Sequence, residues 1–165
     1  MIRLLHIQPS VASSVNASNS HAMVSRLLSK HFRFLYTFDS GHELVGCVEG
    51  NYFDNAPSLV FNLRALKAIC LDPQGNLLIS FDEVFGQFNT NTPEVLFSGS
   101  RTTEGSFFSF NYRGSEATIY DALTDDWITT GWNPNNWAVE EFTPPRDRAV
   151  ALPLNHPIWA TWVSA

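Results

Sequence analysis

Residues 32–51, FRFLYTFDSGHELVGCVEGN, decide the fold of this chain. Every second residue of 32–38 carries an aromatic ring, and such a period of two is typical of a strand half-buried against a core. The polar segment 39–42 supplies turn residues, and leucine, valine and two glycines share one face of 43–50. The stretch therefore predicts a β-hairpin whose glycines leave room for the facing rings.

Other short runs rich in β-branched and aromatic residues follow at 77–81, 95–97, 107–112, 117–120 and 137–142. Residues 59–71 fit either a strand or a short helix at 62–69. We prefer the strand, because the turn residues 72–76 join it naturally to the next run. Residues 82–93 and 121–136 have the composition of loops. Six to eight short strands of this kind predict an all-β fold, an antiparallel sandwich or barrel.

Length and composition predict a single domain. The chain has 165 residues, of which 44% are hydrophobic and 16% charged, a globular composition. We expect a flexible leader at 1–30, the antiparallel β domain at 31–142 and an irregular tail at 143–165.

Charge and hydropathy limit the classes of partner that this chain is expected to bind. The net charge is −6, and lysine and arginine are scattered singly, which argues against a nucleic-acid partner. No apolar segment approaches the ~20 residues that span a bilayer, and no signal-peptide apolar region follows the first residues. A glycan or a small molecule remains as the partner class. The compartment and the oligomeric state stay open.

The sequence predicts neither a metal nor a cofactor. Cys47 and Cys70 have no zinc-site spacing, and we expect two buried free thiols, with a disulfide as the alternative. The histidines show no metal-binding spacing, and no phosphate-binding glycine loop or dinucleotide fingerprint is present.

Three stretches carry a family resemblance: FLYTFDSGHELVGCVEG, GNLLISFDEVFG and NPNNWAVEEF. They resemble the uncharacterised all-β domains of bacterial exported proteins with a PEP-CTERM sorting tail, in which a similar hairpin opens the domain and an Asn-Pro…Trp strand ends it. The resemblance covers roughly residues 32–142 and implies an exported all-β domain. It implies no catalytic residue, and in this chain we expect neither the sorting tail nor a signal peptide.

Two groups of residues could carry chemistry. The acidic pairs Asp82-Glu83 and Asp125-Asp126 could act as acid and base in a carboxylate-dependent hydrolase, although we expect them on separate solvated loops. Trp127 and Trp132 lie in an acidic, Asn-rich region, where an exposed ring can stack on a sugar while polar groups take its hydroxyls. Core packing of these rings is the competing and preferred interpretation.

The leading hypothesis from the sequence is a non-catalytic surface or binding module for a glycan or small ligand. Its candidate ligand-binding residues are Trp127, Trp132, Asp125 and Asp126, and no catalytic residue is assigned. The alternative is the carboxylate-dependent hydrolase. A third hypothesis, an interior pocket of the lipocalin kind, needs an aromatic-lined cavity.

Overall fold

The computed structural model describes residues 25–111 and 114–143. In this part of the chain ten strands form one antiparallel sheet: β1 (Leu27–Thr37), β2 (Glu43–Phe53), β3 (Ala56–Leu71), β4 (Leu77–Phe81), β5 (Glu83–Asn89), β6 (Val95–Ser100), β7 (Phe107–Asn111), β8 (Glu116–Asp121), β9 (Asp126–Gly131) and β10 (Trp137–Phe142). A single 3-10 turn, Pro134–Asn136, precedes β10. The all-β antiparallel class predicted from the sequence is therefore confirmed.

The expected number of six to eight strands is too low, because β5 and β9 form where the composition predicts loops. β1 begins at Leu27, four residues before the predicted start of the domain at 31. The predicted leader up to residue 24 and the predicted tail from residue 144 lie outside the described residues. None of the described residues forms a helix that is long and apolar enough to cross a membrane.

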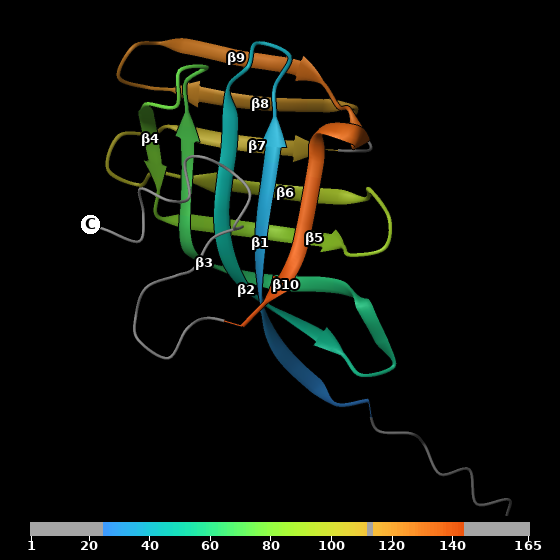
Figure 1. Ribbon diagram of the computed structural model, residues 1–165. Helices are drawn as coiled ribbons and strands as arrows, with labels where there is room; N and C mark the ends of the chain where they lie inside the picture. The colour runs from blue at the N-terminus through green and yellow to red at the C-terminus, as the bar shows by residue number, and fades with distance from the viewer. Residues whose placement is uncertain (1–24, 112–113, 144–165) are drawn as a thin grey trace, which may run out of the picture.

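The sheet curls into a half-barrel of two layers. Its strand order is β10-β1-β2-β3-β5-β6-β7-β8-β9, with β4 paired to β3. Figure 1 shows β10, β1, β2 and β3 upright in front of β5 to β9, which cross behind them. β3 turns the sheet, because residues 59–61 pair with β5 whereas residues 68–71 pair with β4. In the described part of the chain β9 and β10, at the two ends of this order, do not pair with each other.

The predicted hairpin is confirmed as β1 and β2, and its rings face inward. Phe32, Phe34, Tyr36 and Phe38 are all buried. The turn between the strands places Gly41 at φ 84°, a conformation that glycine adopts without strain. The hairpin therefore supplies one wall of the core.

Each inward ring of β1 meets a different strand of the rear layer. Phe32 contacts Phe88 of β5 with ring centroids 5.2 Å apart, Phe34 contacts Phe97 of β6 at 4.8 Å, and Tyr36 contacts Phe110 of β7 at 4.8 Å. Alternate residues along a strand are about 6.7 Å apart and neighbouring strands about 4.8 Å. Such a succession of contacts requires β1 to run across the rear strands, as in orthogonally packed sheets.

Tyr36 also ties the open edge of the half-barrel to β1. Its hydroxyl donates to the carbonyl of Gly131 at 3.4 Å and accepts from the backbone N–H of Asn133 at 3.2 Å. The Trp132 ring stacks on the Tyr36 ring, with centroids 4.9 Å apart and planes 12° apart. These contacts hold the connection between β9 and β10 against the core.

Residues 56–71 form the strand β3, so the preferred strand interpretation is confirmed and the helix alternative at 62–69 is wrong. The turn after it depends on Asp72, whose carboxylate accepts from the backbone N–H groups of Gln74 and Asn76. Cys47 and Cys70 are buried and free, as predicted. Cys47 lies opposite Lys67 and Cys70 opposite Leu44, so the two thiols point to opposite faces of the sheet.

We expect Phe34→Ala to lower the free energy of unfolding by about 3–5 kcal/mol, the usual cost of removing a buried phenyl ring. Urea denaturation of the full chain measures this change. Phe85→Ala is the matched control, because the Phe85 side chain is 54% exposed and its loss should cost under about 1 kcal/mol. A loss below about 1 kcal/mol for Phe34→Ala would contradict the assignment of this ring to the core.

A second stability prediction concerns Gly46, which lies opposite Phe34. A Cβ at Gly46 would meet the Lys67 carbonyl oxygen at 2.4 Å and Phe34 Cζ at 2.7 Å. Gly46→Ala should therefore destabilise the fold by about 1–3 kcal/mol, as overpacking does. Gly131→Ala is the control, since a Cβ there meets nothing within 4 Å. Equal denaturation midpoints for the two variants would refute the close approach of β2 and β3.

Candidate functional site

The structure separates the two tryptophans of the predicted site. Trp127 is the second residue of β9, points outward and is 59% exposed. Trp132 follows the end of β9 and packs against the core on the inner side of the sheet. The two therefore lie on opposite faces, and a single ligand cannot contact both rings.

Trp132 is a core residue in this structure, in agreement with the core-packing interpretation. Besides stacking on Tyr36, its ring contacts Phe110 at 5.9 Å and Trp137 at 6.1 Å. Its indole Nε1 is buried and has no hydrogen-bond partner among the described residues. The ring face that a sugar would need is already occupied by the Tyr36 ring.

Trp127 belongs to an outward-facing aromatic triad that it forms with Phe107 and Tyr120. The strand register places Phe107 opposite Tyr120 and Tyr120 opposite Trp127. The ring centroids lie 4.5 Å apart for Tyr120–Trp127, 5.6 Å for Phe107–Tyr120 and 5.7 Å for Phe107–Trp127. Each ring touches the other two, so the exposed indole is held in place by its neighbours.

A row of hydroxyl groups runs beside the triad on the same outer face. The register across β6, β7, β8 and β9 aligns Ser98, Ser109, Thr118 and Thr129. Thr118 and Thr129 hydroxyls are 3.3 Å apart and share a hydrogen bond. Farther along the face, Gln87, Leu96 and Asn111 line a shallow pocket. The face thus combines exposed rings with neutral donors and acceptors.

Acidic side chains gather at the turn next to Trp127. Asp125 has φ 57°, in the left-handed region that aspartate tolerates better than most residues. Its Oδ1 accepts the hydroxyl of Tyr120 at 3.1 Å. Asp126 opens β9 opposite Asp121. Of the predicted residues, Asp125 therefore reaches the triad and orients its Tyr120 ring, whereas Asp126 directly precedes Trp127 in β9 and falls on the opposite face of the strand.

The hydrogen bond to Asp125 is the main reason why the pKa of Tyr120 lies above its ordinary value. Desolvation and the negative charges of Asp125 and Asp121 raise it further. Ionising Tyr120 would remove the donor and place a phenolate beside two carboxylates. The hydroxyl therefore stays protonated at neutral pH, and the triad keeps its geometry.

The other predicted acidic pair, Asp82-Glu83, lies at the start of β5, far from Asp125 and Asp126. Four strand spacings separate β5 from β9, which puts the backbones about 19 Å apart. The backbone N–H and hydroxyl of Thr102 donate to the Asp82 carboxylate and lower its pKa. A general acid in glycoside hydrolysis needs a raised pKa and a partner within ~10 Å. The pairs are not arranged as acid and base.

The described residues form neither an interior ligand pocket nor a metal site. The interior that a lipocalin-type ligand would occupy is filled by the ring contacts of Phe34, Phe97 and Phe110. Among residues 25–111 and 114–143, no group of three or more His, Cys, Asp or Glu side chains could hold a metal ion.

Sequence reasoning missed two members of the triad, Phe107 and Tyr120. The sequence does contain a signal: Phe108 and Phe110 lie on one face of the strand, and Phe107, one residue out of step, lies on the other. A ring out of phase with the buried set marks an outward position. The contact of Phe107 with Trp127, however, depends on β9, a strand that the composition does not reveal.

Comparisons of the chain with protein-family models, with curated proteins and with solved structures find no match. The resemblance to domains of PEP-CTERM proteins stays a prediction.

We expect Asp125→Asn to lower the pKa of Tyr120 toward the ordinary value near 10, because it removes the carboxylate that favours the protonated hydroxyl. Asparagine tolerates the positive φ, so the turn is kept. NMR titration of ring-labelled tyrosines measures the change, with Tyr36 as the internal control. An unchanged pKa of Tyr120 would contradict the hydrogen bond.

The raised pKa of Tyr120 also makes the free energy of unfolding depend on pH. A folded-state pKa above the unfolded value favours folding at every pH below about 10. This contribution is lost as the pH rises from about 10 through the folded-state pKa of Tyr120. The free energy of unfolding of the wild-type chain should therefore fall as the pH rises above about 10. The fall should be smaller in Asp125→Asn, and urea denaturation at a series of alkaline pH values measures both.

Proposed function

We propose that this domain is a non-catalytic binding module that holds a glycan on the outer face of β7, β8 and β9. The observation that carries the proposal is the state of Trp127, whose indole is 59% exposed and yet fixed by contacts with Phe107 and Tyr120. A rigid exposed ring can stack on the apolar face of a sugar at little cost in side-chain entropy.

The polar groups around Trp127 favour a glycan over a small apolar ligand. The Ser98–Ser109–Thr118–Thr129 row offers hydroxyls that both donate and accept. Asp125 is exposed at the turn beside the triad, and its carboxylate, which already accepts the Tyr120 hydroxyl, can also accept hydrogen bonds from sugar hydroxyls. A purely apolar ligand would leave these groups without partners when it covered them. An exported location, which the family resemblance implies, would bring this face into contact with extracellular glycans.

The hydrolase alternative receives no support from the acidic residues. The backbone separation of about 19 Å between β5 and β9 exceeds the ~5–10 Å between the two carboxyl groups of glycosidases. We therefore assign no catalytic step to the proposed function.

The experiment is a glycan array probed with the full chain, followed by calorimetry with soluble oligosaccharides of the strongest class. Trp127→Ala should weaken binding at least tenfold, because loss of a central aromatic contact costs about 2 kcal/mol or more. Phe85→Ala is the matched control, since Phe85 is an exposed ring on the same outer face outside the triad. Undiminished binding by Trp127→Ala, or no array signal from the wild-type chain, would refute the proposal.

A further inference from the structure

A shallow pocket, here called the β5–β6 pocket, opens on the outer face of the rear layer beside the turn between β5 and β6. Its volume is about 170 Å³. Pockets that enclose a whole drug-sized ligand measure ~300–1,000 Å³, so this one has room for a single unit of a larger molecule. It is lined by the partly or fully exposed side chains of Leu59, Gln87, Asn89, Glu94, Leu96 and Asn111.

The lining combines apolar walls with polar groups that the backbone holds in place. Leu59 and Leu96 are 40% and 54% exposed and form the apolar walls. The Asn89 Oδ1 atom accepts from the backbone N–H of residue 91 at 2.8 Å, and the Asn111 Oδ1 atom accepts from that of residue 114 at 2.9 Å. The Nδ2 group of each amide can still donate to a ligand. Oriented donors beside apolar walls suit the hydroxyls and the apolar face of a sugar ring.

The strand register places the β5–β6 pocket and the aromatic triad on one face of the sheet, at opposite corners. Trp127 lies level with Ser100 of β6, and Leu96 lies four residues before Ser100 on that strand. Three strand spacings, about 14 Å, therefore separate Trp127 from Leu96 across the sheet, and four residues, about 13 Å, separate them along it. The straight-line separation is about 20 Å.

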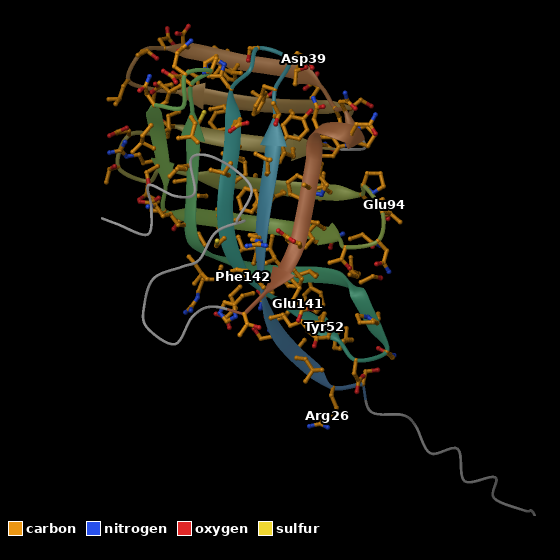
Figure 2. All side chains as sticks on the ribbon, viewed as in Figure 1. Arg26, Asp39, Tyr52, Glu94, Glu141 and Phe142 are labelled. Atoms are coloured by element: carbon orange, nitrogen blue, oxygen red, sulfur yellow. The ribbon has the colours of Figure 1, made fainter. Side chains whose placement is uncertain are left out.

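Small hydroxyl side chains form the surface between these two corners. Thr118 of β8 and Ser109 of β7 are paired, and they lie between the position of Trp127 and that of Leu96. Figure 1 shows β9 beginning at the left end of the rear strands, and in Figure 2 Glu94 marks the β5–β6 turn at their right end. A ligand that runs diagonally across the rear layer therefore meets a ring at one end, hydroxyls in the middle and a pocket at the other end.

On the basis of the binding function proposed above, we propose that the glycan is a linear oligosaccharide of several units, which stacks one unit on Trp127 and places another in the β5–β6 pocket. The separation of about 20 Å is longer than a sugar ring, so a single unit cannot occupy both places. Once one end is bound, binding of the other becomes intramolecular and raises the overall affinity. The domain thus recognises a stretch of a chain, not one terminal sugar.

The length of the ligand is tested by calorimetry of the full chain. The probes are the disaccharide to the hexasaccharide of the glycan that binds most strongly on the array. The affinity should rise at least tenfold from the disaccharide to the hexasaccharide, because only the longer chain reaches both places. A site limited to the triad gains only severalfold, from the larger number of equivalent units on the longer chain. A gain of that smaller size would overturn the proposal.

Variants separate the pocket from the triad. The double variant Gln87→Ala with Leu96→Ala should weaken hexasaccharide binding about three- to tenfold and leave disaccharide binding unchanged, whereas Trp127→Ala should weaken both. Phe85→Ala is the matched control, because Phe85 is 54% exposed, as Leu96 is, and does not line the pocket. It should change neither affinity.

The outcomes distinguish this inference from the function on which it rests. Wild-type affinity for the hexasaccharide in the double variant, together with weakened binding by Trp127→Ala, would overturn the two-place ligand and leave the binding function standing. Undiminished binding of both probes by Trp127→Ala would overturn both.

NMR of the unaltered chain gives a readout that does not depend on the folding of any variant. The side-chain amide signals of Gln87 and Asn111 should shift on saturation with the hexasaccharide and stay in place with the disaccharide. The indole N–H signal of Trp127 should shift with both. Amide signals that do not move at saturating hexasaccharide would overturn the proposal.

Discussion

The packing of Phe34 over Gly46 is the contact on which the rest of this structure depends. The missing side chain of Gly46 lets the Phe34 ring pack directly against β2 and lets β3 approach β2, since a Cβ there would collide with both. The same ring meets Phe97 of the rear layer and stacks on Trp137 of β10. One residue thus joins the hairpin, the opposite layer and the last strand. Gly99 of β6 has the same role, because its missing side chain leaves room for the ring of Phe108.

A core built from crossing rings explains why the sheet stays an open half-barrel. The rings between the layers keep the front and rear strands apart, so β9 and β10, at the ends of the order, remain unpaired in the described chain. Tyr36 compensates for this open edge through its two hydrogen bonds to the chain between β9 and β10. Burial is the main cause that raises the pKa of Tyr36, so the hydroxyl keeps its proton and remains a donor across the physiological range.

Sequence reasoning predicted the strand in which one face is uniformly buried. It missed β5 and β9, in which buried and exposed residues do not alternate regularly. The rings of residues 32–38 repeat with a period of two and were predictable. β5 breaks that period at Gly86, whose φ is 113°. β9 ends the strand order, and none of its residues is fully buried, so it lacks the alternation of buried and exposed residues that marks a strand in the sequence. Trp127 could be chosen from composition. Trp132, five residues later and hence on the other face of an extended chain, could be excluded only once the extent of β9 was known.

The contrast between the two outer faces bears on why Trp127 is exposed at all. If the triad served packing alone, burial energy would favour covering the largest ring most completely. The order is the reverse: Phe107 and Tyr120 are partly buried, while the larger indole is the most exposed of the three. The front face shows that this fold can bury apolar side chains on an outer surface, as it does for Val45 and Ile69. An indole that is held firmly and still left open therefore supports the proposal that this surface binds a ligand, and the neighbouring hydroxyl row favours a polar ligand over an apolar one.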